Sequence, residues 1–222
     1  MGAGGSPATT HEGTMPKIYI LGNGGFAQEV FEQIILNQAV KETFGGFVIL
    51  KDDEAILIGD EGANPFTFPA SARFVIGTGN KFWRKTFIEK FTEHYQTNLY
   101  HFPNVEAPYA YVSKTSYVGV GNVFMNFSVL NGNAAIGNFN MLYSYSSIHH
   151  DCILGDNNLL SPYAGVMGYC KVGNDNFLGT GTHLTPKVSI GNENTLSAGE
   201  TVFDDMKTRQ FFQHGLVLDK KS

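Results

Sequence analysis

Residues 136–155 read IGNFNMLYSYSSIHHDCILG and show the pattern that governs the second half of the chain. An apolar residue stands at every sixth position from Val112 to Val202. The series consists of Val112, Val118, Phe124, Leu130, Ile136, Leu142, Ile148, Leu154, Leu160, Val166, Val172, Leu178, Leu184, Ile190, Leu196 and Val202. Neither an α-helix nor a plain strand gives a period of six. A coil of three short strands does, because each strand then turns one side chain inward per six residues.

A second pattern, with a period of eighteen residues, lies on the first. A glycine follows every third apolar residue and an asparagine stands three positions later; these are Gly119, Gly137, Gly155, Gly173 and Gly191, with Asn122, Asn140, Asn158, Asn176 and Asn194. We expect them at a corner, because glycine and asparagine tolerate positive φ best. Asparagine amides can also hydrogen-bond down a column. The pattern predicts a parallel β-helix of about five stacked coils, which bury their apolar faces against each other.

The first half of the chain follows a different pattern. Residues 17–21 read as a strand, a glycine turn follows, and a helical pattern runs from Gln28 to about Gln38. Further strands are expected at 45–50 and 74–77, and a further helix at about 81–97. These elements predict a small α/β unit with a short parallel sheet, of the Rossmann-like kind. Its ligand should lie at the carboxyl ends of the strands.

The glycine turn carries a G-x-G-x-x-A sequence at Gly22, Gly24 and Ala27, between a strand and a helix. In that context the motif is typical of a turn that presents backbone N–H groups to an anion. Asp52 and Asp53 follow the second expected strand, where they could reach a ribose or a base, or could simply belong to a solvated turn. The expected substrate-binding residues of this unit are Gly22, Asn23, Gly24, Gly25, Asp52, Asp53 and Asn80.

Composition narrows the classes of protein. The formal net charge of −5 and the lack of a basic stripe argue against nucleic acid as a partner, and no run of eighteen apolar residues is present. Two cysteines, both expected inside the coil, favour a reducing, cytoplasmic location. We expect residues 1–14 to be an expression tag or disordered, 15–104 to form the α/β domain, 105–205 the β-helix domain and 206–222 a tail.

His149, His150 and Asp151 are the candidate catalytic residues, because they follow the inward Ile148 directly. An imidazole can take a proton near neutral pH, and a neighbouring carboxylate can fix its tautomer. A solvated corner is the alternative reading. Zinc would need a third ligand close by. His183 is the remaining histidine on the β-helix and is expected at a corner, so we predict no metal site.

The chain resembles the hexapeptide-repeat sugar acyltransferases, in particular the nucleotide-sugar N-acetyltransferases of the bacillosamine and perosamine type and the sialic acid O-acetyltransferases. The resemblance covers nearly all of residues 17–203. It is carried by residues 18–25 (IYILGNGG), 75–80 (VIGTGN) with Arg84, and 148–155 (IHHDCILG). The last stretch is the most specific.

This resemblance implies a left-handed β-helix and a homotrimer in which acetyl-CoA, or another acyl-CoA, lies between adjacent coils. It implies that His150 is the general base, that Asp151 supports it, and that Arg84 joins the substrate-binding residues. The implied activity is transfer of an acyl group, with acetyl the expected one, to the amine of a nucleotide-linked amino-dideoxy sugar in lipopolysaccharide, O-antigen or other glycan biosynthesis. The positions implied to contact acyl-CoA are Ala164, Gly168, Gly181 and Ala198.

The chain departs from the family pattern at three single positions and in its tail, where residues 211–218 (FFQHGLVL) stand in place of the usual closing Gly-x-Pro-Ala segment. Leu159 stands where many relatives have a second histidine, Tyr163 where a glycine usually follows Ser-Pro, and Phe26 where the glycine turn often has a histidine. Two other functions therefore stay open: O-acetylation of a sugar hydroxyl, as in a sialic acid or polysaccharide precursor, and a trimeric binding module without catalysis.

Overall fold

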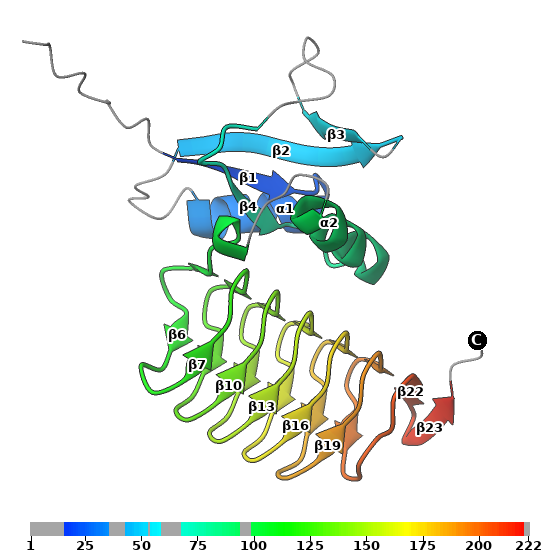
Figure 1. The fold of residues 1–222 in the computed structure, drawn as a ribbon. Helices are drawn as coiled ribbons and strands as arrows, with labels where there is room; N and C mark the ends of the chain where they lie inside the picture. The colour runs from blue at the N-terminus through cyan, green and yellow to red at the C-terminus, as the bar shows by residue number, and fades with distance from the viewer. Residues whose placement is uncertain (1–15, 36–42, 53, 59–67, 94–98, 220–222) are drawn as a thin grey trace, which may run out of the picture.

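The computed structural model describes residues 16–35, 43–52, 54–58, 68–93 and 99–219. A small mixed unit sits on one side of a long parallel β-solenoid (Figure 1). Residues 1–14, Asp53 and the expected helix ends at 36–38 and 94–97 lie outside the described residues. At its C-terminal end the solenoid carries a hairpin of β22 (Gln210–Gln213) and β23 (Leu216–Asp219).

The N-terminal unit is a four-stranded sheet in the order β3-β2-β1-β4. Its strands are β1 (Lys17–Leu21), β2 (Thr43–Lys51), β3 (Glu54–Leu57) and β4 (Arg73–Ile76). The central β1 runs parallel to both β2 and β4, whereas β3 pairs with β2 in the antiparallel direction. The expected strands are confirmed, but the sheet is mixed, because β3 pairs with the preceding β2 in the antiparallel direction.

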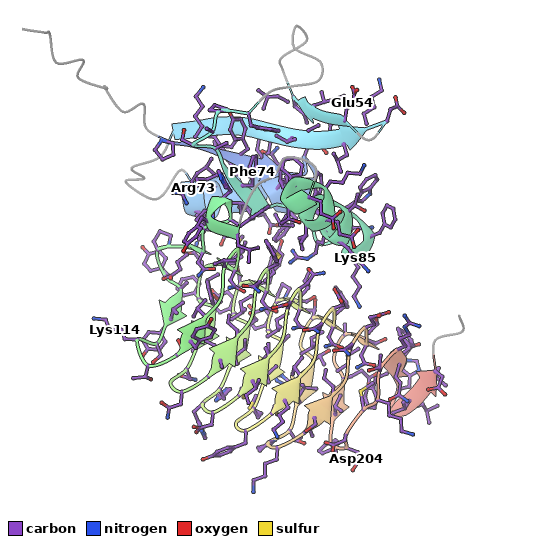
Figure 2. The ribbon with its side chains drawn as sticks, in the orientation of Figure 1. Glu54, Arg73, Phe74, Lys85, Lys114 and Asp204 are labelled. Atoms are coloured by element: carbon purple, nitrogen blue, oxygen red, sulfur yellow. The ribbon has the colours of Figure 1, made fainter. Side chains whose placement is uncertain are left out.

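The helices of this unit follow the first and last strands. They are α1 (Gly25–Val30), which continues as the π-helical turn η1 (Phe31–Ile35), and α2 (Lys81–Glu93). A short 3₁₀ turn, η2 (Leu99–His101), leads to the solenoid. Aromatic rings fill the space between sheet and α2: Phe74 lies 4.9 Å from Phe91, centroid to centroid. Figure 2 shows side chains occupying the seam between this unit and the coils below.

Three parallel sheets form the sides of the solenoid. The docked sheet, which carries the N-terminal unit, contains β5 (Val105–Glu106), β8 (Val123–Phe124), β11 (Met141–Leu142), β14 (Leu159–Leu160), β17 (Phe177–Leu178) and β20 (Thr195–Leu196), extended by β22 and β23. The six-stranded sheet contains β6 (Tyr111–Val112), β9 (Val129–Leu130), β12 (Ser147–Ile148), β15 (Gly165–Val166), β18 (His183–Leu184) and β21 (Thr201–Val202). The five-stranded sheet contains β7 (Tyr117–Val118), β10 (Ala135–Ile136), β13 (Ile153–Leu154), β16 (Lys171–Val172) and β19 (Ser189–Ile190).

The repeat of six positions is confirmed as the inward face. Every member of the apolar series is buried except Val112 and Val118, which pack against the same core from the open N-terminal end. The six-stranded sheet gives about six turns in place of the expected five. The count rises because the apolar series both begins (Val112) and ends (Val202) on this sheet.

A column of hydrogen-bonded asparagines links successive coils at the corner between the five-stranded and docked sheets. The Oδ1 atom of each asparagine accepts the backbone N–H of the asparagine one coil later, with donor–acceptor distances of 2.8 to 3.0 Å along the series Asn122, Asn140, Asn158, Asn176 and Asn194. The amide nitrogens of the first four asparagines donate to glycine carbonyls, as Asn158 does to Gly173 at 2.9 Å. The column expected from the eighteen-residue period is confirmed.

The repeated glycines serve close approach between coils, not positive φ. A Cβ atom on Gly155 would lie 2.0 Å from Oδ1 of Asn174 and 3.0 Å from the carbonyl oxygen of Gly173. Positive φ falls two positions later instead, on Asn157 (53°) and Asp175 (59°). The expectation of glycine at the left-handed position was wrong, because contact with the next coil is the stricter constraint.

Removing one asparagine from the column should destabilise the solenoid. In Asn158→Ala, the backbone N–H of Asn176 and the carbonyl of Gly173 lose their partners in a buried place. We expect a loss of about 1–3 kcal/mol in the free energy of unfolding, the cost of leaving such groups unpaired. Chemical denaturation checks this value. Asn174→Ala is the control. The exposed Asn174 also accepts a backbone N–H through its Oδ1, from Asp156, so the same kind of hydrogen bond is removed at the surface. A smaller loss is expected there, because water can replace the missing amide.

Candidate active site

His150 and Asp151 form a hydrogen-bonded pair at the corner between the six-stranded and five-stranded sheets, which we call the dyad corner (residues 149–152). The Nδ1 atom of His150 lies 2.8 Å from Oδ2 of Asp151. Their side chains are 56% and 34% exposed, so the imidazole is accessible and the carboxylate is partly covered. The carboxylate stabilises the tautomer with a proton on Nδ1, which leaves Nε2 free to accept a proton.

The backbone of the neighbouring coils fixes this pair. Asp151 has a φ of 59°, and its N–H donates to the carbonyl of Gly132 in the coil before. The carbonyl of His150 accepts the N–H of Tyr169, whose ring also meets the imidazole edge-on, with centroids 5.2 Å apart. The imidazole is therefore held by its own coil and the next one.

Gly168 lies directly beside the imidazole. A Cβ atom on this residue would come within 2.9 Å of Cε1 and of Nε2 of His150. The carbonyl of Gly168 accepts the N–H of Lys187, whereas its own N–H has no backbone partner among the described residues. A backbone N–H without a backbone partner, on a residue beside the imidazole, is a candidate donor to an oxyanion.

The other three positions expected at acyl-CoA lie elsewhere. Ala164 is fully buried in the solenoid core, and its N–H and carbonyl are both engaged, with Ser161 and Ser147. Gly181 and Ala198 lie on the corner between the docked and six-stranded sheets. Of the four positions expected at acyl-CoA, Gly168 therefore lies beside the dyad, whereas Ala164 is not at the surface.

That second corner, the aromatic corner, carries a stack of exposed rings. Tyr109, Phe127, Tyr145 and Tyr163 follow one another at centroid distances of 5.3, 4.9 and 5.0 Å, with planes within 14° of parallel. Tyr163, which replaces the usual glycine of the family, is the last ring. The column continues with Gly181 at a φ of 66°, where a Cβ atom would meet nothing within 4 Å. The stack therefore ends beside open space.

His183 lies on β18, facing outward on the six-stranded sheet, and not at a corner as expected. It stands one residue before the inward Leu184, and this position in the repeat was the signal for a strand. Its Nδ1 is buried and has no hydrogen-bond partner among the described residues. A Cβ atom on Gly165 would lie 2.6 Å from that nitrogen, so the imidazole needs a glycine beneath it.

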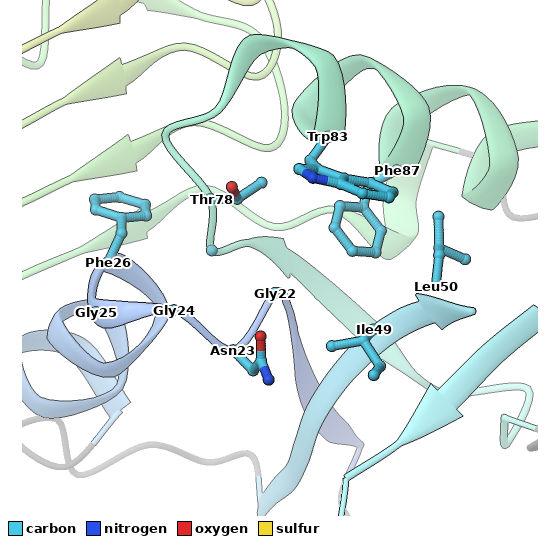
Figure 3. A pocket seen from close by; sticks show the side chains of 11 residues that line it. Gly22, Asn23, Gly24, Gly25, Phe26, Ile49, Leu50, Thr78, Trp83 and Phe87 are labelled. Carbon is cyan, nitrogen blue, oxygen red and sulfur yellow. The ribbon is translucent and has the colours of Figure 1, made fainter.

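The N-terminal unit contains a pocket of about 480 Å³ at the carboxyl ends of β1 and β4 (Figure 3). It is lined by Gly22, Asn23, Gly24, Gly25, Phe26, Ile49, Leu50, Gly77, Thr78, Trp83 and Phe87. The glycine turn thus lines the pocket, in the place expected of a ligand site. Trp83 and Phe87 were missed in the sequence. Their spacing of four on a helix directly after the third parallel strand could have indicated them.

Arg84 and Asn80, which were also expected to bind substrate, do not line this pocket. Arg84 is buried and donates to Oδ1 of Asn157 at 2.9 Å and to the carbonyls of Thr78 and Phe139. Burial lowers the pKa of Arg84 to about 10, and the nearby Asp175 carboxylate acts in the opposite direction. Oδ1 of Asn80 accepts the N–H of Trp83 at the start of α2. Arg84 therefore joins the N-terminal unit to the solenoid and does not line the pocket.

Phe26 and Leu159 also lie at this junction. The ring of Phe26 packs against Tyr143 of the solenoid at 5.1 Å, and the hydroxyl of Tyr143 donates to the carboxylate of Glu29. Burial, and then the hydrogen bond and charge of Glu29, raise the pKa of Tyr143 well above its usual value. Leu159 is buried in the apolar cluster between the two parts. Both departures from the family pattern thus contribute apolar surface to the interface.

The two cysteines are packing residues inside the coil. Cys152 and Cys170 are fully buried and donate to the carbonyls of Met167 at 2.9 Å and Thr185 at 3.1 Å, respectively. A hydrogen bond with Cys170, and then burial, raise the pKa of Cys152 far above its usual value. Its thiol therefore stays protonated.

Within one chain the pocket and the dyad lie on opposite sides of the solenoid. The N-terminal unit packs on the docked sheet through Val105, Val123, Met141 and Leu159. The dyad corner joins the other two sheets and is the edge of the triangle opposite to the docked sheet. The pocket and His150 of the same chain are therefore separated by the solenoid.

Among the described residues, no three His, Cys, Asp or Glu side chains come together as metal ligands, and no helix is long and apolar enough to cross a membrane. No protein-family model and no curated protein sequence matches this chain.

Several solved structures share the whole architecture. The acetyltransferase domain of PglB from Neisseria gonorrhoeae is 22% identical with a TM-score of 0.69, covering 90% of this chain and 94% of its own. PerB from Caulobacter crescentus, solved with CoA and GDP-perosamine, is 23% identical with a TM-score of 0.70, covering 89% and 94%. WeeI from Acinetobacter baumannii is 20% identical with a TM-score of 0.73, covering 92% and 100%. The resemblance in fold to hexapeptide-repeat sugar acyltransferases is thereby confirmed.

Proposed function

We propose that the protein is an acyl-CoA-dependent N-acyltransferase that modifies the amine of a nucleotide-linked amino-dideoxy sugar. The observation that carries this proposal is the hydrogen-bonded His150–Asp151 pair, with Gly168 directly beside the imidazole. It is supported by the fold shared with PglB and with PerB, whose structure holds CoA and GDP-perosamine. Residues 15–104 would bind the nucleotide sugar and residues 105–205 would carry out the transfer.

The proposed reaction is a direct attack of the sugar amine on the thioester carbonyl. As the C–N bond forms, Nε2 of His150 takes a proton from the amine, and Asp151 stabilises the resulting imidazolium. The carbonyl oxygen becomes an oxyanion, which the N–H of Gly168 would stabilise. The intermediate then breaks its C–S bond, and the departing CoA sulfur receives the proton from His150. Holding both substrates at attack distance would supply much of the rate.

We also propose that the active site is shared between chains of a homotrimer. The pocket and His150 of one chain face opposite sides of the solenoid, so the sugar in one pocket would meet the dyad of a neighbouring chain. Mixing inactive His150→Ala chains with chains carrying a blocked pocket, such as Gly24→Trp, tests this idea. Activity should return in the mixed oligomers, and two inactive parents that stay inactive after mixing would contradict a shared site.

The substrates themselves are tested by thermal shift and by product analysis. CoA and acetyl-CoA should stabilise the protein, by about 2.7 kcal/mol at one hundred times the dissociation constant. Mass spectrometry after incubation with acetyl-CoA and amino-sugar nucleotides should show an acylated amine. Acylation of a hydroxyl in the matching hydroxy sugar, with no reaction at the amine, would overturn N-acylation in favour of O-acylation.

Gly168 offers a test in which the proposed base is displaced but not removed. In Gly168→Ala the new methyl group would meet Cε1 and Nε2 of His150 at 2.9 Å, so the imidazole must move. A displacement on the order of 1 Å is expected to lower kcat by about 10²-fold. The melting temperature should change little, because the mobile end of a surface side chain gives way. Unchanged kcat would show that the imidazole position beside Gly168 does not matter.

A further inference from the structure

The pocket of the N-terminal unit has two apolar walls that face each other. Trp83 and Phe87 project from α2 on one side, and Ile49 and Leu50 lie at the end of β2 on the other (Figure 3). Trp83 is 43% exposed, so a large part of its ring is available to a ligand. A slot between an indole and aliphatic side chains suits a flat heteroaromatic ring, since stacking on an aromatic face is favourable for every base.

A second hollow continues this slot. It measures about 400 Å³ and is lined by Leu50, Asp52, Trp83 and Thr86. Leu50 and Trp83 line both hollows, so the two form one trough. The glycine turn lies at one end of the trough and the Asp52 carboxylate at the other. A nucleotide with its diphosphate at the glycine turn would place its base between Trp83 and Leu50, with the outer edge of the base at Asp52.

Asp52 is the one ionisable side chain among the described residues that line the trough. It lies in the turn between β2 and β3 with a φ of 49°. A carboxylate only accepts hydrogen bonds, and its two oxygens match two adjacent N–H donors. The base edge that reaches Asp52 must therefore present donors side by side.

Guanine is the base that meets this requirement. Its N1–H and N2 amino group stand next to each other on the Watson–Crick edge. Uracil and thymine present a single N–H between two carbonyl oxygens, which a carboxylate repels, and adenine presents one amino group beside an acceptor nitrogen. We propose that the trough selects guanine, so that the acceptor substrate is a guanosine-diphosphate-linked amino sugar. This inference rests on the proposed function and names its substrate class.

Trp83 is the sole tryptophan of the chain and reports binding directly. The full chain is titrated with GDP, ADP, UDP and dTDP while the fluorescence of Trp83 is followed, with calorimetry as a second measurement. We expect quenching, and a dissociation constant for GDP at least about 10-fold lower than for the other three, as two paired hydrogen bonds to a base edge provide.

Asp52→Asn tests the carboxylate. Asparagine also tolerates positive φ, so the hairpin should be retained, but one acceptor becomes a donor that opposes a donor of guanine. We expect about 10-fold weaker GDP binding and little change for UDP. The matched control is Glu54→Gln, which removes one negative charge from the same hairpin outside the trough lining (Figure 2). A general charge effect would instead strengthen binding of all four nucleotides in both variants.

The outcomes separate this inference from the proposed function. Binding of UDP, dTDP or ADP as tight as that of GDP, or an unchanged preference in Asp52→Asn, would overturn guanine selection and leave a nucleotide-sugar substrate intact. Failure of all four nucleotides to bind by either measurement would contradict the proposed nucleotide-sugar substrate as well.

Discussion

His150→Ala is expected to lower kcat by about 10²–10⁴ while the chain stays folded. The imidazole is more than half exposed and contributes no packing to the core, so its loss removes the proton acceptor and little else. Steady-state assays with saturating acetyl-CoA, together with a melting curve, measure the two effects separately. KM for the sugar nucleotide should change far less than kcat, because the proposed nucleotide pocket lies in the N-terminal unit.

His149→Ala is the matched control for this experiment. His149 precedes His150 but has no part in the hydrogen bond to Asp151, and we expect activity near that of the parent protein. Full activity in His150→Ala would assign the base to His149 or to the substrate amine itself. Asp151→Asn should fall between the two, since the imidazole remains but loses the group that fixes its tautomer.

Leu178→Asp should cost more than about 4 kcal/mol in the free energy of unfolding. Leu178 is fully buried in the solenoid core, between Leu160 and Leu196 of the neighbouring coils. An aspartate there would place an unpaired charge among aliphatic side chains. Denaturant unfolding followed by circular dichroism measures the loss, and a variant too unstable to purify folded agrees with it.

Ile153→Asp provides the comparison. Ile153 is apolar and lies on a strand of the same solenoid, but its side chain points outward and is 55% exposed. We expect a change of about 0.5 kcal/mol or less, as for most surface positions. Equal losses at Leu178 and Ile153 would be incompatible with the inward assignment of the six-residue series.

The solenoid could be predicted from sequence because its repeat is strict and each coil contacts only its neighbours. Inward residues such as Leu160 and Leu178 follow from counting alone. The role of the repeated glycines could not be predicted, because a Cβ atom on Gly155 would clash with the side chain of Asn174, nineteen positions away. The antiparallel β3 was missed because its turn contains Asp52 and not the glycine pair that usually marks a hairpin.

In the candidate site, too, some features could be predicted from the sequence and others could not. The pairing of His150 with Asp151 could be predicted since the two are adjacent in the chain. The position of Gly168 beside the imidazole needs the next coil, and the burial of Arg84 needs contacts with Asn157 and Phe139, far along the sequence. The family resemblance implied a ligand role for Arg84, whereas the direction of its side chain is set by packing that the sequence does not show.

Each coil contains eighteen residues, and this number limits how such a protein can change its length in evolution. Duplication or loss of eighteen residues would keep every edge of the prism aligned and move the N-terminal unit up or down by one layer. A change of six residues within the coils would instead rotate everything beyond it by one side. The imidazole would then emerge on a different edge, away from the residues that surround it now.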